Sequence, residues 1–120
     1  MLVIEQDPLS SEAVAGTIEE LGHELDWASS GKEAMDKLTR SEFDVVLLDV
    51  FLPDFSATRL IPELKRIRSD IGIIPMAERN SRDLEREIRR LGILYYMTKP
   101  VSSVDLKDLL NHVSKRLVHK

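Results

Sequence analysis

The most informative segment of this chain is the sequence FDVVLLD at residues 43–49, a nearly unbroken apolar run that ends on the carboxylate of Asp49. A strand that is apolar on both of its faces is typical of the interior of a parallel sheet, because helices cover both faces of such a sheet. The run therefore predicts a central strand with Asp49 at its carboxyl end.

Apolar segments of two kinds alternate on either side of this run. Short β-rich runs predict four more strands, over residues 2–4, 23–28, 71–76 and 94–97. Apolar residues at helical spacing predict five helices. The first covers residues 8–21, the second begins at residue 31, and the third covers 58–68. The fourth ends at residue 91, and the fifth follows a capping box at 102–105 and continues to residue 117. Strands that alternate with helices require right-handed crossovers and a parallel sheet covered on both faces.

Residues that start or stop helices mark several of these boundaries. Asp7 followed by Pro8 is typical of an N-cap and a first helical residue, and Ser81 is expected to cap the fourth helix. Gly22 and Gly92 follow the last apolar positions of the first and fourth helices, where glycine commonly ends a helix.

Two prolines limit the predicted elements. Pro62 fits the third helix only if it lies in the first turn, because proline has no N–H to donate further along a helix. Pro75 lies near the end of an inner strand and removes one donor from the sheet, so the fourth strand is expected to finish early or to deform there.

Composition excludes several classes of function. The 120 residues carry 17 basic and 21 acidic side chains, a net charge of −4 that argues against a dedicated nucleic-acid surface. There is no cysteine, which excludes disulfide scaffolds, thiol nucleophiles and zinc sites built on cysteine. The longest apolar stretch, residues 45–53, is broken by Asp49 and is too short to cross a bilayer. With no export signal at Met1, one soluble, cytoplasmic domain over residues 1–120 is expected.

Polar residues gather where the predicted strands end. The first strand is followed by Glu5, Gln6 and Asp7, the third ends at Asp49, the fourth ends near residues 77–78, and Lys99 follows the fifth. In an open parallel sheet the functional crevice lies at this edge. Asp49 could cap the next loop, ligate a metal or act as a nucleophile, and Asp7 is already expected to cap a helix. Carboxylates and one lysine are thus expected to converge.

The same residues carry a family resemblance that extends over essentially the whole chain. Residues 43–53 resemble the phosphoacceptor strand and loop of the receiver domain of bacterial two-component response regulators, with Asp49 as the phosphorylated residue and Pro53 in the loop. Residues 96–100 resemble the family's lysine–proline segment, in which a cis peptide typically joins the residues that are here Lys99 and Pro100. Glu5 and Gln6 align with the pair of acids that holds Mg²⁺.

This resemblance implies a fold and a chemistry. The implied fold is the flavodoxin-like three-layer α/β sandwich, with five parallel strands in the order 2-1-3-4-5 and five helices. Asp49 would accept a phosphoryl group from a kinase phosphohistidine. Mg²⁺ would be held by Glu5, Gln6, Asp49 and the carbonyl of Phe51, and Lys99 would pair with a phosphoryl oxygen. Such a protein is a signalling domain and not an enzyme, beyond self-phosphotransfer and autodephosphorylation.

Three positions depart from the family pattern. Gln6 brings an amide in place of a second carboxylate, so Mg²⁺ is expected to bind more weakly. Ala77 stands where the family has a switch serine or threonine, so Tyr96, the aromatic switch residue, lacks the hydroxyl it would follow. Ala57 replaces a glycine, and a positive φ there would cost about 1 kcal/mol or redirect the loop.

These departures leave alternatives open. The chain is either an atypical receiver that is phosphorylated at Asp49, or a pseudo-receiver that binds a partner without phosphorylation. A phosphatase of the haloacid dehalogenase type would need a second aspartate where Phe51 stands.

The expected partners are a sensor histidine kinase or a phosphotransfer protein, and an effector that this chain does not contain. The resemblance implies that the effector contacts the fourth helix and the Tyr96 face, and a homodimer through the same surface is compatible with its arginine content. Neither nucleic acid nor membrane is expected as a direct partner. The arginines of the fourth helix also fit a solvated face with i,i+4 ion pairs; they are Arg79, Arg82, Arg86, Arg89 and Arg90.

Overall fold

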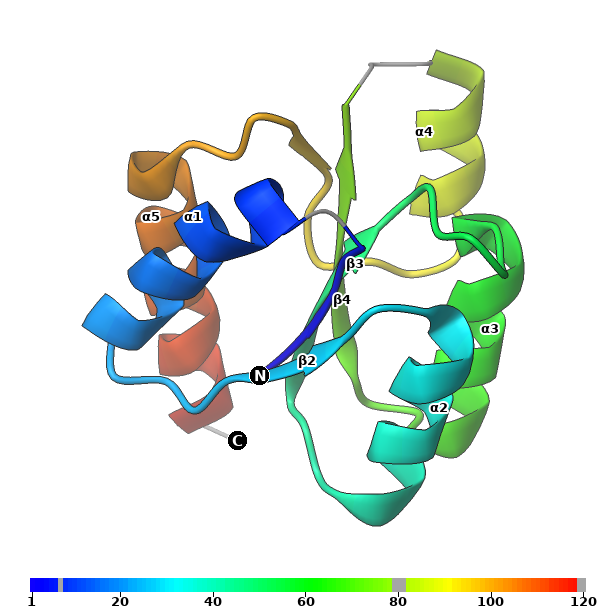
Figure 1. Ribbon diagram of the computed structural model, residues 1–120, viewed down its shortest axis with the longest axis horizontal. Helices are drawn as coiled ribbons and strands as arrows, with labels where there is room; N and C mark the ends of the chain where they lie inside the picture. The colour runs from blue at the N-terminus through cyan, green and yellow to red at the C-terminus, as the bar shows by residue number, and fades with distance from the viewer. Residues whose placement is uncertain (7, 79–81, 119–120) are drawn as a thin grey trace.

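The computed structural model describes residues 1–6, 8–78 and 82–118, and strands and helices alternate along them (Figure 1). The elements are β1 (Leu2–Ile4), α1 (Pro8–Glu20), β2 (Asp26–Ala28), α2 (Gly31–Arg40), β3 (Val45–Asp49), α3 (Ala57–Ile67), β4 (Gly72–Ala77), α4 (Arg82–Arg89), β5 (Met97–Thr98) and α5 (Ser103–Val118).

The five strands form one parallel sheet in the order β2-β1-β3-β4-β5. Helices α1 and α5 cover one face, and α2, α3 and α4 cover the other (Figure 1). This is the flavodoxin-like three-layer sandwich that the resemblance implied. Among the described residues, no helix combines the length and the apolarity needed to span a membrane.

The central strand β3 is buried along its whole length, as its apolar sequence predicts. Val46 and Leu48 belong to the apolar layer under α2, α3 and α4, whereas Val45 and Leu47 belong to the layer under α1 and α5. Successive side chains of a strand point to opposite faces. The run of apolar residues therefore supplies both layers of the core and leaves Asp49 at the edge.

The predicted helix ends that fall on described residues lie within two residues of the observed ones; the fourth helix, predicted through 91, ends at Arg89. The Ser30 hydroxyl caps α2 by accepting from the Glu33 N–H at 3.2 Å, and the Ser102 hydroxyl accepts from the Asp105 N–H at 3.3 Å at the start of α5. Gly22 and Gly92 have φ of 76° and 80°, the left-handed conformation that glycine adopts without strain. The caps expected at Asp7 and Ser81 lie outside the described residues.

Pro62 is a correction, because it lies in the second turn of α3, not in the first. Helix α3 begins at Ala57, so a residue at position 62 would ordinarily donate its N–H to the Thr58 carbonyl. Proline cannot supply that bond. The helix nevertheless continues to Ile67 because one face of α3 packs into the core through Leu60, Ile61 and Leu64, while Pro62 is exposed.

Pro75 is a second correction, because β4 neither ends early nor breaks there. The Ala77 carbonyl accepts from the Lys99 N–H on the β5 side at 2.7 Å. Residues two apart in a parallel strand turn their backbone groups to the same neighbour, so the Pro75 nitrogen also faces β5. Strand β5 pairs with β4 only from Met76 and Met97 onwards. The N–H that Pro75 lacks thus shortens β5, which was predicted over 94–97. The pairing of β4 with β3 on the other side is intact.

Strand β2 is also shorter than the predicted 23–28. Its pairing with β1 begins at Leu2 and Asp26, and the Met1 carbonyl accepts from the Asp26 N–H at 3.0 Å. Residues 23–25 therefore form the connection from α1.

Candidate functional site

The predicted site residues come together at the carboxyl edge of the sheet, the upper edge in Figure 1. Glu5 directly follows β1, Asp49 ends β3, Ala77 ends β4 and Lys99 directly follows β5. The parallel topology brings these chain positions to one edge, although the first and last are 94 residues apart. The expected convergence of carboxylates and one lysine is present.

The centre of the site is a buried cluster of three charged groups. The Lys99 Nζ lies 2.5 Å from Glu5 Oε2 and 3.6 Å from Asp49 Oδ2. Glu5, Asp49 and Lys99 are only 5%, 6% and 9% exposed. Burial by itself lowers the pKa of the Lys99 ammonium, but the two carboxylates outweigh that effect and hold the pKa above its ordinary value. Lys99 is therefore charged at neutral pH.

Asp49 is harder to ionise than an ordinary aspartate. Burial, followed by a hydrogen bond with Glu5, raises its pKa from 3.8 to about 6. The Phe51 N–H, which donates to Asp49 Oδ1 at 3.1 Å, and the Lys99 charge act in the opposite direction. At neutral pH the carboxylate is ionised, and its environment favours any partner that brings positive charge.

Gln6 lies beside this cluster and engages the backbone of the neighbouring loop. Its Nε2 donates to the Phe51 carbonyl oxygen at 3.3 Å. The nitrogen end of the amide, and not the oxygen expected of a metal ligand, thus faces Phe51. A carbonyl oxygen can only accept, so only the –NH₂ end of Gln6 can bind it.

The oxygen donors of the site fit a hard divalent cation. Glu5, Asp49 and the Phe51 carbonyl are the ligand types that Mg²⁺ prefers, and Mg²⁺ usually takes one or two carboxylates and keeps several waters. Within residues 1–6, 8–78 and 82–118, no three acidic, histidine or cysteine side chains form a metal-binding group. Asp7, a further acid near the pocket in sequence, lies outside those residues. Glu5, Asp49 and the Phe51 carbonyl therefore fit a Mg²⁺ site with only two charged protein ligands.

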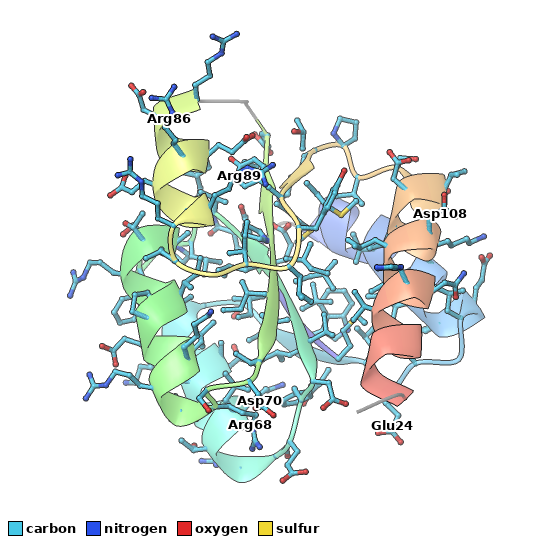
Figure 2. The ribbon with its side chains drawn as sticks, turned by 180° about the vertical axis from the view of Figure 1, so that it is seen from behind. Glu24, Arg68, Asp70, Arg86, Arg89 and Asp108 are labelled. Carbon is cyan, nitrogen blue, oxygen red and sulfur yellow. The ribbon has the colours of Figure 1, made fainter. Side chains whose placement is uncertain are left out.

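The two predicted switch residues are both buried, but the structure shows no polar contact between them. Ala77 is fully buried, and its carbonyl positions Lys99 by accepting from its N–H. Tyr96 is 6% exposed, and its hydroxyl is buried without a hydrogen-bond partner. Arg89 reaches from α4 towards the strands (Figure 2), and its guanidinium lies 5.8 Å from the centroid of the Tyr96 ring. Burial is the main cause of the raised pKa of Tyr96.

The loop residues are also in place. The peptide bond between Lys99 and Pro100 is cis, the isomer that the resemblance implies. Pro53 is exposed in the loop after β3. Ala57 is the first residue of α3, and none of the described non-glycine residues has a positive φ. The redirected loop or conformational cost considered for Ala57 is therefore not needed, because the helix begins there.

One residue of this loop was missed by sequence reasoning. The Asp54 carboxylate accepts from the Gly31 N–H at 2.9 Å and from the Lys32 N–H at 3.0 Å, at the start of α2. These bonds lower the pKa of Asp54 despite the opposing effect of burial. Asp54 thereby anchors the loop after β3 to a second helix. It is 23 residues from Gly31, so local capping patterns could not reveal it.

The fourth helix carries exposed arginines, as expected. Within the described part of α4 these are Arg82, Arg86, Arg89 and Arg90 at its end; Arg79 lies outside it. Arg89 forms an i,i+4 ion pair with Glu85 at 3.1 Å. This pair supports the interpretation of the helix as a solvated, charged face.

Comparisons with known proteins agree with this geometry. The family model of the response regulator receiver domain matches residues 1–111. The DNA-binding transcriptional regulator NtrC of Azospirillum brasilense is 28% identical over 117 residues, covering 98% of this chain and 24% of that protein. The sensory transduction protein RegX3 of Mycolicibacterium smegmatis is 30% identical over 117 residues, covering 97% of this chain and 50% of that protein. The chain thus spans half or less of the length of both relatives.

Solved structures show the same fold. A two-component response regulator from Clostridium difficile has a TM-score of 0.91 at 22% identity, covering 97% of this chain and 95% of that chain. The receiver domain of a sensor histidine kinase from Pseudomonas aeruginosa PAO1, which has a magnesium ion coordinated in its active site cleft, has a TM-score of 0.82 at 19% identity. That match covers 92% of this chain and 93% of the other.

Proposed function

This chain belongs to the family of response regulator receiver domains, and from that premise we propose that Asp49 accepts a phosphoryl group from the phosphohistidine of a sensor histidine kinase or of a phosphotransfer protein. The phosphorylated domain then relays the signal by a change in conformation. In this role residues 1–120 act as one receiver domain whose effector lies outside these residues. The domain signals and does not turn over a metabolic substrate.

One observation carries the proposal: the buried carboxylate of Asp49 lies 3.6 Å from the ammonium of Lys99 at the carboxyl edge of the sheet. Burying a carboxylate costs free energy, and the Lys99 ammonium beside Asp49 offsets part of that cost. A capping role for Asp49 would not require a lysine from a distant strand. A phosphoacceptor does require positive charge close to the incoming group.

The reaction follows from these positions. A carboxylate oxygen of Asp49 attacks phosphorus, a P–O bond forms as the P–N bond to the imidazole breaks, and the electron pair of that bond returns to the imidazole nitrogen. Lys99 can neutralise one phosphoryl oxygen, and the Phe51 N–H holds Asp49 Oδ1 in place. The contribution of this chain is therefore positioning and charge stabilisation.

A divalent cation completes the proposed site. Glu5, Asp49 and the Phe51 carbonyl would hold Mg²⁺, which when bound neutralises the negative charge of the phosphoryl oxygens. Gln6 contributes no charge, so the affinity for Mg²⁺ is lower than that of a site with two acids at residues 5 and 6. Lys99 already lies 2.5 Å from Glu5 and competes for the same carboxylate.

A second function is favoured by the switch positions. Ala77 offers no hydroxyl, and the Tyr96 hydroxyl is buried without a partner, so the usual coupling between phosphorylation and Tyr96 lacks its hydrogen-bonding group. A pseudo-receiver that binds its partner independently of phosphorylation fits these two residues. In either case the partner surface is α4 with the Tyr96 face, where an effector or a second copy of the chain would bind.

Phosphorylation by acetyl phosphate in the presence of Mg²⁺ tests the proposal, with intact mass measured promptly. A phosphate adduct on the native chain and none on Asp49→Ala would support a working receiver. An adduct that persists on Asp49→Ala would assign the acceptor to another residue. If purified histidine kinases and acetyl phosphate both leave the native chain unmodified at high Mg²⁺, the pseudo-receiver is the better description.

A further inference from the structure

We propose that Gln6 is an amide latch on the Phe51 carbonyl, which holds the cation pocket partly closed and opens when a divalent cation binds. This inference rests on the proposed function, since it concerns access to the same pocket. In this role Gln6 is not a ligand. Its side chain weakens binding of the cation, whereas an acid at this position would strengthen it.

The latch follows from how the Phe51 peptide is held. Its N–H donates to Asp49 Oδ1 at 3.1 Å, and its carbonyl oxygen accepts from Gln6 Nε2 at 3.3 Å. Phe51 also forms an isolated antiparallel bridge with Ser56, at the other end of the same loop. Gln6 therefore ties the segment that follows β1 to a loop already fixed to Asp49.

The chemistry of the two ends of the amide explains the competition. The –NH₂ group at the Phe51 carbonyl carries partial positive charge, as a cation at that oxygen would. A cation that approaches the Phe51 oxygen repels this group, so the side chain must turn or withdraw. Glutamate at position 6 could not form the latch, because an ionised carboxylate has no donor. The closed arrangement is thus a consequence of the amide.

The hydrogen bond from Gln6 is also one of the contacts that orient the Phe51 peptide. The Phe51 side chain is 58% exposed, so packing of the ring cannot by itself fix this peptide. The two hydrogen bonds orient its N–H and its carbonyl instead. Removing the donor of Gln6 should therefore loosen the Phe51 carbonyl and leave the buried contact between Lys99 and Glu5 unchanged.

Titration of the isotope-labelled chain with MgCl₂ tests the proposal, followed by the backbone amide signals of Asp49 and Phe51. Gln6→Met keeps the length of the side chain and removes both its donor and its acceptor, and Gln6→Glu restores a carboxylate. Loss of one hydrogen bond predicts that Gln6→Met binds Mg²⁺ about two- to ten-fold more tightly than the native chain. Gln6→Glu should bind more tightly still.

The outcomes separate the latch from the proposed function. If Gln6→Met binds Mg²⁺ with the native affinity or more weakly, Gln6 is a bystander or a ligand and the latch is wrong, while the pocket stands. If Mg²⁺ moves no signal in any of the three proteins, both the cation pocket and the latch are wrong. Without Mg²⁺, amide hydrogen exchange in residues 51–56 should be faster in Gln6→Met, and an unchanged rate would also contradict the latch.

Discussion

Lys99 donates to Glu5 across 94 positions of the sequence, at a distance of 2.5 Å and almost shielded from water. The contact joins the segment after β5 to the segment after β1, with Asp49 of the central strand between them. A single ammonium thus compensates two buried carboxylates. The consequences for stability, for ionisation and for the switch positions can each be measured.

Replacement of Lys99 by methionine should destabilise the fold. Both carboxylates would lose their counter-ion while staying buried, which typically costs about 3 to 5 kcal/mol. Urea unfolding of Lys99→Met measures this loss. The double variant Lys99→Met with Glu5→Gln should recover part of it, because only one buried carboxylate then remains. A Lys99→Met protein as stable as the native chain would show that the ammonium does not compensate these groups.

Asp49→Asn should stabilise the protein at pH 7. The folded-state pKa of Asp49, about 6, exceeds its ordinary value of 3.8, so the folded state holds its proton more tightly than the unfolded state does. The native chain therefore loses stability as pH rises from about 4 through 6. Asparagine avoids this loss, for a gain of about 1 to 3 kcal/mol at pH 7. Denaturant unfolding should show that the gain disappears near pH 4, and a gain of equal size at both pH values would contradict ionisation as its cause.

The ionisation of Asp49 can also be followed directly. Side-chain carbon signals in nuclear magnetic resonance should give a titration midpoint near pH 6 for Asp49 without divalent cations. Addition of Mg²⁺ should lower the midpoint, because a nearby cation favours the charged carboxylate. The signal is assigned by its loss in Asp49→Asn. A midpoint that does not move with Mg²⁺ would place the cation away from Asp49.

Tyr96→Phe should raise the free energy of unfolding by about 1 kcal/mol. The Tyr96 hydroxyl is buried without a hydrogen-bond partner, and phenylalanine removes this unsatisfied group while keeping the ring and its contact with Arg89. The matched control is Tyr95→Phe, because Tyr95 is 52% exposed and its hydroxyl should contribute little. Thermal or urea unfolding compares the two, and a destabilised Tyr96→Phe would indicate that the hydroxyl has a partner in solution.

Pro62→Ala should stabilise α3 by about 1 to 3 kcal/mol. Alanine restores the N–H that can donate to the Thr58 carbonyl inside the helix, and the exposed position of Pro62 avoids any change in the core. Pro53→Ala in the exposed loop after β3 serves as the control. Loss of proline there should destabilise slightly, because the unfolded chain gains freedom. A similar effect at both positions would argue against a helical origin of the gain.

Much of the site could be predicted from the sequence because its strongest signals are local. An apolar run that ends on Asp49 predicts a buried strand with a carboxylate at its carboxyl end, and alternation with helices makes the sheet parallel. Parallel strands bring their carboxyl ends to one edge, so Glu5, Asp49 and Lys99 could be expected together. Resemblance to receiver domains added the strand order, which alternation alone leaves open.

The errors concern which side of an element a residue faces. Pro62 was expected only in the first turn of its helix, yet packing of the opposite face keeps the helix intact around it. Pro75 was expected to disturb its strand, but its nitrogen faces the side where β5 has not yet begun. The spacing of apolar residues along the chain predicts whether a segment is a helix or a strand. The elements that pack beside it decide whether the backbone N–H that proline lacks is needed.

The sequence by itself determined the alternation of strands and helices, the central strand, and which polar side chains follow the strands at the carboxyl edge. These features depend on the spacing of apolar residues and on helix caps, which involve residues only a few positions apart. Only the tertiary structure decided that Lys99 binds Glu5 more closely than Asp49, that Asp54 caps α2, and that Gln6 presents its nitrogen to Phe51. These contacts join residues from different elements. Their geometry depends on how the sheet and its loops place each side chain, which no local pattern contains.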